Sequence, residues 1–272
     1  MAAPDRTILL TGATSGLGRA VAGVLAKRND RLILHGRDRQ RLGEIVDELA
    51  DMPAQIEIVE ADLSDLQQVE QLATDVAALT DHLDVLVHNA GVGKGATNTR
   101  ELSADGYELR LAVNYLAPFA LTQRLLPLLE IGAPSRIVNV ASGSQQPLDF
   151  SDPHMAQGYT GDRAYAQSKF AMVTFGFALA KRLLADVVTV NSLHPASLMP
   201  TKMVEEGYGH TVDDLETGVN AVVNLVTNPG LAGTTGQFFS IQQPAAAHPK
   251  TYEADTQQQL WQLSEDLTGV RY

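Results

Sequence analysis

The most constraining feature of this chain is a regular alternation of short runs rich in β-branched and aliphatic residues with longer amphipathic stretches. The short runs predict strands at 7–10, 31–35, 55–60, 85–88, 136–140, 187–193 and 237–241. The stretches between them predict helices at 17–28, 39–50, 66–79, 103–130, 164–184 and 213–227. This order is typical of a doubly wound α/β fold: a seven-stranded parallel sheet with helices on both faces and right-handed crossovers.

The chain shows no linker, repeat or change of composition, so we expect a single domain over residues 1–272. Asp38, Ser64 and Ser103 stand where helix N-caps are expected. Pro127 predicts an early end to the helix that contains it.

The C-terminal tail, residues 242–272, departs from this pattern. It begins with small and polar residues and then predicts one helix with an apolar face formed by Leu260, Leu263 and Leu267. Gly269 is a suitable stop for that helix. We expect the helix to dock on the body of the domain; covering a site and pairing two subunits are the alternatives.

Composition excludes several classes of function. Asp and Glu total 32 against 20 Lys and Arg, and a net charge of -12 disfavours a nucleic-acid partner. Without cysteine there is no disulfide framework, thiolate zinc site or thiol nucleophile, and the 7 histidines show no ligand spacing, so no metal is expected. No run of about 18 apolar residues is present, so we expect no membrane span and a cytoplasmic protein.

Glycines crowd the turn between the first predicted strand and the first predicted helix, Thr11-Gly12-Ala13-Thr14-Ser15-Gly16-Leu17-Gly18. Glycine lets the backbone approach a pyrophosphate, and the helix that follows offers free N–H groups and partial positive charge. The spacing differs from the common G-x-G-x-x-G, and a plain structural turn is the alternative. Its place in the fold favours a dinucleotide site with contacts from Gly12, Thr14, Ser15, Gly16, Leu17 and Gly18.

The end of the second predicted strand indicates which dinucleotide binds there. An acidic residue at this point holds the ribose of NAD, whereas arginine accommodates the 2'-phosphate of NADP. Here Gly36 is followed by Arg37, with Arg39 and Arg41 close behind in an otherwise acidic chain. Guanidinium groups pair with phosphate, so we expect NADP(H) rather than NAD(H).

Five motifs in this order resemble those of the short-chain dehydrogenase/reductase family: Thr11–Gly18, His88-Asn89-Ala90-Gly91, Asn114, Ser142 and Tyr165-Ala166-Gln167-Ser168-Lys169. The resemblance covers nearly the whole chain and is nearest to retinol-dehydrogenase-like and carbonyl-reductase-like members. It implies a Rossmann fold and an enzyme that interconverts carbonyls and alcohols. It also implies a homodimer or homotetramer formed through the two long helices before and within the catalytic region.

The resemblance also implies a role for particular residues. The catalytic set would be Asn114, Ser142, Tyr165 and Lys169, with Ser144 as a competitor for the role of Ser142. Beyond the glycine turn and Arg37, the cofactor would be held by Asp62, Leu63, Asn89, Ala90, Gly91, Tyr165, Lys169, Pro195 and Thr201.

The catalytic pair has a simple chemical basis. Tyr165 and Lys169 are four positions apart at the start of a predicted helix, so they share one face. A phenol ordinarily has a pKa near 10, and a neighbouring ammonium favours the phenolate. A cationic nicotinamide ring acts in the same direction, so we expect Lys169 and the bound cofactor together to lower the pKa of Tyr165, which then acts as the general acid or base.

Two segments, residues 143–162 and 197–210, are expected to be irregular loops that wall the substrate site. Their mixture of Met, aromatic and aliphatic residues favours a fairly apolar carbonyl or secondary alcohol. The sequence thus predicts an NADP(H)-dependent oxidoreductase acting on a small molecule. The alternative is a binding protein of the same fold that senses NADP(H) without turnover.

Overall fold

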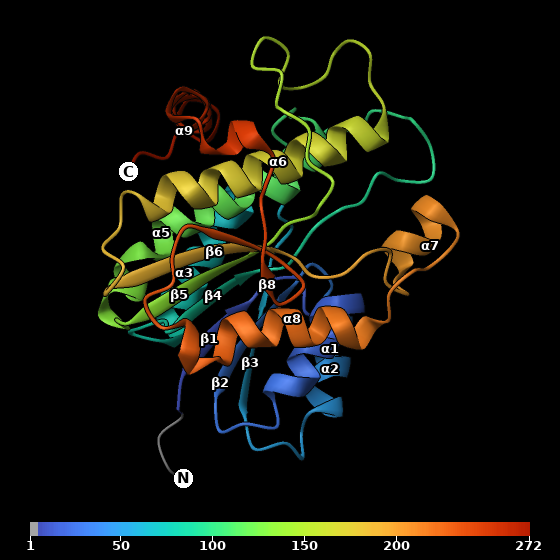
Figure 1. The fold of residues 1–272 in the computed structure, drawn as a ribbon. Coiled ribbons are helices and arrows are strands. Elements are labelled where there is room, and N and C mark those ends of the chain that lie inside the picture. The colour runs from blue at the N-terminus through green and yellow to red at the C-terminus, as the bar shows by residue number, and fades with distance from the viewer. Residues whose placement is uncertain (1–4) are drawn as a thin grey trace.

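The computed structural model describes residues 5–272 as one sheet with helices on both faces (Figure 1). Its strands are β1 (Thr7–Leu10), β2 (Arg31–Gly36), β3 (Gln55–Glu60), β4 (Val85–His88), β5 (Ser135–Val140), β6 (Val188–His194), β7 (Gln237–Ser240) and β8 (Gln243–Pro244). They are ordered β3-β2-β1-β4-β5-β6-β7-β8. The seven predicted strands are parallel, and a short antiparallel strand, β8, extends the edge.

The helices form a layer on each face of the sheet. On one face lie α1 (Gly16–Leu25), α2 (Arg39–Glu48) and α8 (Leu215–Thr227), and on the other α3 (Leu66–Leu79), α5 (Ala117–Ile131) and α6 (Gly161–Ala180) (Figure 1). Strand order reverses between β1 and β4, which is where ligands bind in open α/β sheets.

One long helix predicted at 103–130 is instead three consecutive pieces. Ser103 accepts the N–H of Tyr107 at 3.2 Å but is not an N-cap, because the next helix begins only at Leu109 and is capped by Glu108. Helix α4 (Leu109–Leu111) leads into a π-helical turn, η1 (Ala112–Leu116), and then into α5. Helix α5 continues past Pro127, which lies exposed within it.

Of the two other predicted N-caps, one agrees with the structure and one does not. Asp38 caps α2 as expected and accepts the N–H of Arg41 at 3.2 Å. Helix α3 is capped by Asp65 and not by Ser64, because the Asp65 carboxylate accepts the N–H of Gln67 at 2.9 Å. A carboxylate at this position also suits the positive end of the helix dipole.

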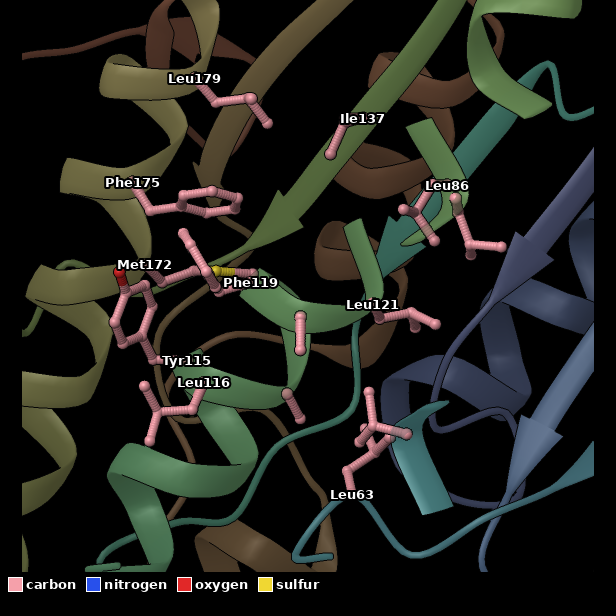
Figure 2. Close-up of a cluster of buried hydrophobic side chains, with 14 of the residues drawn as sticks. Leu63, Leu86, Tyr115, Leu116, Phe119, Leu121, Ile137, Met172, Phe175 and Leu179 are labelled. Atoms are coloured by element: carbon pink, nitrogen blue, oxygen red, sulfur yellow. The ribbon is translucent and has the colours of Figure 1, made fainter. Parts of the chain in front are cut away.

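The larger of the hydrophobic clusters lies between the sheet and the layer of α3, α5 and α6. Figure 2 shows Phe119 from α5 beside Met172 and Phe175 from α6, with Ile137 on the neighbouring strand β5. The rings of Phe119 and Phe175 meet edge to face with their centroids 5.4 Å apart. This packing fixes α6 against the end of β5, and so it fixes the two elements that carry the predicted catalytic residues.

The tail lies against the body of the domain. A 3-10 turn, η3 (Pro249–Tyr252), leads into helix α9 (Ala254–Thr268), which lies outermost against α6 (Figure 1). Trp261 is buried, with its ring centroid 5.4 Å from that of Phe119. The helix ends at Gly269, which adopts the expected left-handed conformation.

Candidate active site

A cleft of about 790 Å³ opens at the carboxyl edge of the sheet. Its walls are formed by the turn after β1, the ends of β2, β3, β4, β5 and β6, and the start of α6. All the predicted cofactor contacts line it: Gly12, Thr14, Ser15, Gly16, Leu17, Gly18, Arg37, Asp62, Leu63, Asn89, Ala90, Gly91, Tyr165, Lys169, Pro195 and Thr201. Ser142 lines it as well, whereas Asn114 lies behind its wall.

The glycine turn has the shape of a phosphate cradle. Gly12 has a left-handed φ of 68°, and a Cβ on it would lie 2.7 Å from the Cα of Ala90. A Cβ on Gly18 would lie 2.1 Å from the carbonyl oxygen of Gly12, so α1 begins directly against the turn. Ser15, at the N-cap of α1, makes no side-chain hydrogen bond there. The first N–H groups of α1 therefore have no side-chain cap and fit a dinucleotide pyrophosphate.

The adenosine end of the cleft combines one carboxylate with exposed arginines. Asp62 accepts the N–H of Ser64 at 2.8 Å, which fixes its side chain in the turn after β3. Arg37 and Arg41 line the same end and are exposed. Arg41 pairs with Asp38 at 3.5 Å, so one of the predicted guanidinium groups already has a carboxylate partner.

The side chain of Asn89 makes a structural contact that the resemblance did not imply. Its Nδ2 donates to the carbonyl oxygens of Thr11 at 2.9 Å and Gly12 at 3.1 Å. The amide nitrogen thus ties the end of β4 to the glycine turn, and Asn89 shapes the cradle in addition to lining it.

Ser142, Tyr165 and Lys169 come together at the inner end of the cleft. Ser142 follows β5, and Tyr165 and Lys169 lie one turn apart on α6. Tyr165 is hydrogen-bonded to the Ser142 side chain. The Lys169 Nζ lies 5.7 Å from the centroid of the Tyr165 ring and donates to the carbonyl oxygen of Val140 at 2.9 Å. Ser144 also lines the cleft, and its N–H donates to Ser142 Oγ at 3.1 Å.

Burial is the main influence on the pKa values of Tyr165 and Lys169. It raises the pKa of Tyr165 above its ordinary value, with the hydrogen bond to Ser142 opposing the shift. Burial also lowers the pKa of Lys169 to about 8. The expected lowering of the Tyr165 pKa by Lys169 is therefore absent in the protein alone, because the ammonium is bonded to the Val140 carbonyl and not to the phenol.

Asn114 owes its position to the π-helical turn η1. Its Oδ1 accepts the N–H of Val92 at 2.7 Å, and its Nδ2 donates to the Val92 carbonyl at 3.0 Å and to Ser168 Oγ at 2.9 Å. The side chain thus joins the end of β4 to α6 next to Lys169. Its amide acts as a structural bridge, and π-helical turns occur often at functional sites.

Of the two segments predicted to wall the substrate site, one lines the cleft along most of its length and the other hardly does. Segment 197–210 lines the cleft with Leu198, Met199, Met203 and Tyr208, but its second half is a helix, α7 (Lys202–Tyr208), and not an irregular loop. Segment 143–162 lines the cleft only at its first two residues. Farther on, its apolar side chains, such as Leu148, pack into the core and so anchor the segment to the body.

Two residues near the substrate end, Lys94 and Arg110, were not predicted from the sequence. Lys94 lies over the ring of Tyr208 at 4.3 Å and pairs with Asp162 at 3.3 Å. Arg110 is buried and donates to the carbonyl of Gly93 at 3.0 Å, which fixes the loop that carries Lys94. Lys94 lies three positions after Gly91 of the N-A-G motif, and its positive charge in the loop after β4 was the signal for it.

Comparison with known proteins places these features in a family. A sequence model of the short chain dehydrogenase family matches residues 6–210. Retinol dehydrogenase 14 of Mus musculus is 32% identical over 294 residues, covering 97% of this chain and 86% of that protein.

Two solved structures share the fold along most of the chain. An uncharacterized Mycobacterium paratuberculosis protein has a TM-score of 0.79 and 29% identity, covering 99% of this chain and 95% of its own. The Pseudomonas aeruginosa RhlG complex with NADP has a TM-score of 0.72 and 25% identity, covering 89% and 98%. With the glycine turn, Ser142, Tyr165 and Lys169 in one cleft, this chain belongs to the short-chain dehydrogenase/reductase family and is retinol-dehydrogenase-like.

Proposed function

We propose that this protein is an NADP(H)-dependent oxidoreductase that transfers a hydride between nicotinamide and a carbonyl or secondary alcohol. The observation that carries the proposal is the convergence of Ser142, Tyr165 and Lys169 at the inner end of a cleft whose other end is the glycine turn. A dinucleotide held by that turn would extend along the cleft toward Tyr165.

The protein's own residues supply the proton and the orientation. A bound reduced nicotinamide supplies the hydride. Ser142 Oγ holds the substrate oxygen in register, and the Tyr165 hydroxyl, kept protonated by burial, delivers its proton to that oxygen. The Lys169 ammonium, anchored on Val140, favours the phenolate that remains. In the oxidative direction the phenolate accepts the proton of the alcohol.

The preference for NADP(H) rests on Arg37. This residue is exposed at the adenosine end of the cleft, beside Gly36, where a carboxylate would hold the ribose of NAD. Because Arg41 already pairs with Asp38, we assign the main phosphate contact to Arg37.

The substrate is proposed to be a fairly apolar carbonyl or alcohol. The substrate end of the cleft is lined by Val92, Leu109, Val113, Leu198 and Met203, and the related retinol dehydrogenases are named for an apolar alcohol.

Turnover of reduced nicotinamide against a panel of apolar aldehydes and ketones tests this function. We expect faster turnover with NADPH than with NADH. We expect Tyr165→Phe to lower kcat by at least about 100-fold, because a general acid contributes factors of that order, while NADPH still binds.

The alternative is an NADP(H)-binding sensor. It would bind NADPH but turn over no member of the panel, and Tyr165→Phe would then change nothing measurable. An Arg37→Asp variant that kept the NADPH preference of the wild type would contradict the assigned phosphate contact.

A further inference from the structure

One histidine in the wall of the cleft is bonded on both sides of its ring. His35 lies in β2 with 2% of its surface exposed, between the glycine turn after β1 and the end of β3. The N–H of Gly12 donates to its Nδ1 at 3.3 Å, and its Nε2 lies 3.0 Å from the carbonyl oxygen of Ala61.

These contacts fix the protonation of the ring. Nδ1 accepts a hydrogen bond and so carries no proton, which leaves Nε2 as the donor to the Ala61 carbonyl. Only the neutral imidazole can make both bonds. Burial lowers the pKa of His35 to about 4, opposed by the hydrogen bond to the Ala61 carbonyl and by the charge of Asp62, so the ring is neutral near pH 7.

The two partners belong to the two halves of the dinucleotide site. Gly12 is the first glycine of the phosphate cradle, held at a left-handed φ. Ala61 directly precedes Asp62, at the adenosine end. The His35 ring spans the gap between Gly12 and Ala61 and bonds to both.

We propose that His35 is a positioning residue for the cofactor: its neutral imidazole bridges the phosphate cradle at Gly12 to the adenosine-binding segment at Ala61 and holds both in register. The proposal rests on the proposed function only in requiring that a nicotinamide dinucleotide binds in this cleft. His35 itself need not touch the cofactor.

Three substitutions separate the two bonds. His35→Leu keeps an apolar volume but removes both contacts. His35→Asn places an amide oxygen near the position of Nδ1 and can accept from Gly12, whereas His35→Gln places an amide nitrogen near Nε2 and can donate to Ala61.

His88 provides a matched control. It is also buried and neutral, with Nε2 2.7 Å from Thr122 Oγ1, but its ring bonds to α5 and not to the cradle. His88→Leu therefore removes a buried imidazole without touching the bridge.

The test is titration of each folded variant with NADPH, alongside thermal unfolding and hydrogen exchange at the Gly12 amide without cofactor. We expect the Kd for NADPH to rise about tenfold in His35→Leu and less in the Asn and Gln variants, as loss of one or two hydrogen bonds implies. We expect faster exchange at Gly12 in the Leu and Gln variants and protection in the Asn variant. His88→Leu should lower the melting temperature but leave the Kd unchanged.

An unchanged NADPH Kd in the His35 variants, with a lower melting temperature alone, would show that the bridge serves only stability and would overturn the proposal. If His35→Leu does not fold, the Asn and Gln variants carry the same comparison. Wild-type protein that binds no nicotinamide dinucleotide would instead overturn the proposed function.

Discussion

At the scale of single residues, burial has opposite effects on the two groups that the proposed chemistry uses. It keeps Tyr165 protonated, which suits a proton donor in the reductive direction. It also destabilises the ammonium of Lys169, whose pKa falls to about 8. The folded protein therefore holds this lysine's proton less tightly than the unfolded chain, where the pKa is near 10.4.

This difference makes the stability of the protein depend on pH in a defined direction. A charged Lys169 costs stability below about pH 8, and the cost disappears as pH rises toward the unfolded-state value. We expect Lys169→Met to abolish turnover yet to stabilise the protein without cofactor, by at most about 3 kcal/mol near pH 6, since one pKa unit corresponds to about 1.4 kcal/mol. The gain should shrink toward about pH 10.

Urea unfolding at both pH values measures this effect. Lys181→Met is the matched control, because Lys181 lies near the end of the same helix and bonds to Gln257 at 2.8 Å. A Lys169→Met variant less stable than wild type near pH 6 would mean that the bond to Val140 outweighs the cost of burial.

At the scale of elements, the periodicity of the sequence predicted most of the features that depend only on residues close together in the chain. The seven parallel strands, the glycine turn and the spacing of Tyr165 and Lys169 all follow from patterns within one run of chain. The π-helical turn at Asn114 could not be predicted, because it depends on the amide meeting Val92, which comes from a distant strand end. The eighth strand and the His35 bridge are likewise contacts between segments.

Helix α7 is the element whose position depends most on such contacts. It has 7 residues, too few for a helix to be stable alone, and Lys94 links it to the body through the Tyr208 ring. We expect Lys94→Met to speed amide exchange in α7 by about two- to fivefold, as loss of a cation–π contact implies, and to raise the KM for substrate.

Exchange measured by mass spectrometry checks this expectation. Lys202→Met is the control, because Lys202 is exposed and pairs with Glu206 within α7 itself. Its exchange in α7 should stay near the wild-type rate. Equal protection of α7 in wild type and Lys94→Met would show that its other contacts suffice.

At the scale of the whole molecule, the burial of α6 by other parts of the chain bears on whether the protein forms oligomers. Every residue from 166 to 179 is buried by the chain itself. The helix packs against β6 on its inner side and against η1, η3 and α9 elsewhere (Figure 1). The resemblance implied a homo-oligomer formed through this helix, but the surface of α6 expected to form it is already covered by the tail, which favours a monomer.

We therefore expect the chain to sediment as a single species of about 29 kDa at micromolar concentration. For a second copy to reach α6, α9 would have to leave and expose Trp261, which lies edge-on against Phe119 and beneath the guanidinium of Arg182, 3.8 Å away. Truncating a buried tryptophan costs about 3–5 kcal/mol, so displacing α9 is unfavourable unless a partner covers an equal apolar area.

Sedimentation velocity of the wild type and of Trp261→Ala measures the oligomeric state of each. A wild-type dimer that persists in Trp261→Ala would place the interface on another face, whereas a dimer seen only in the variant would show that α9 is what keeps α6 from pairing.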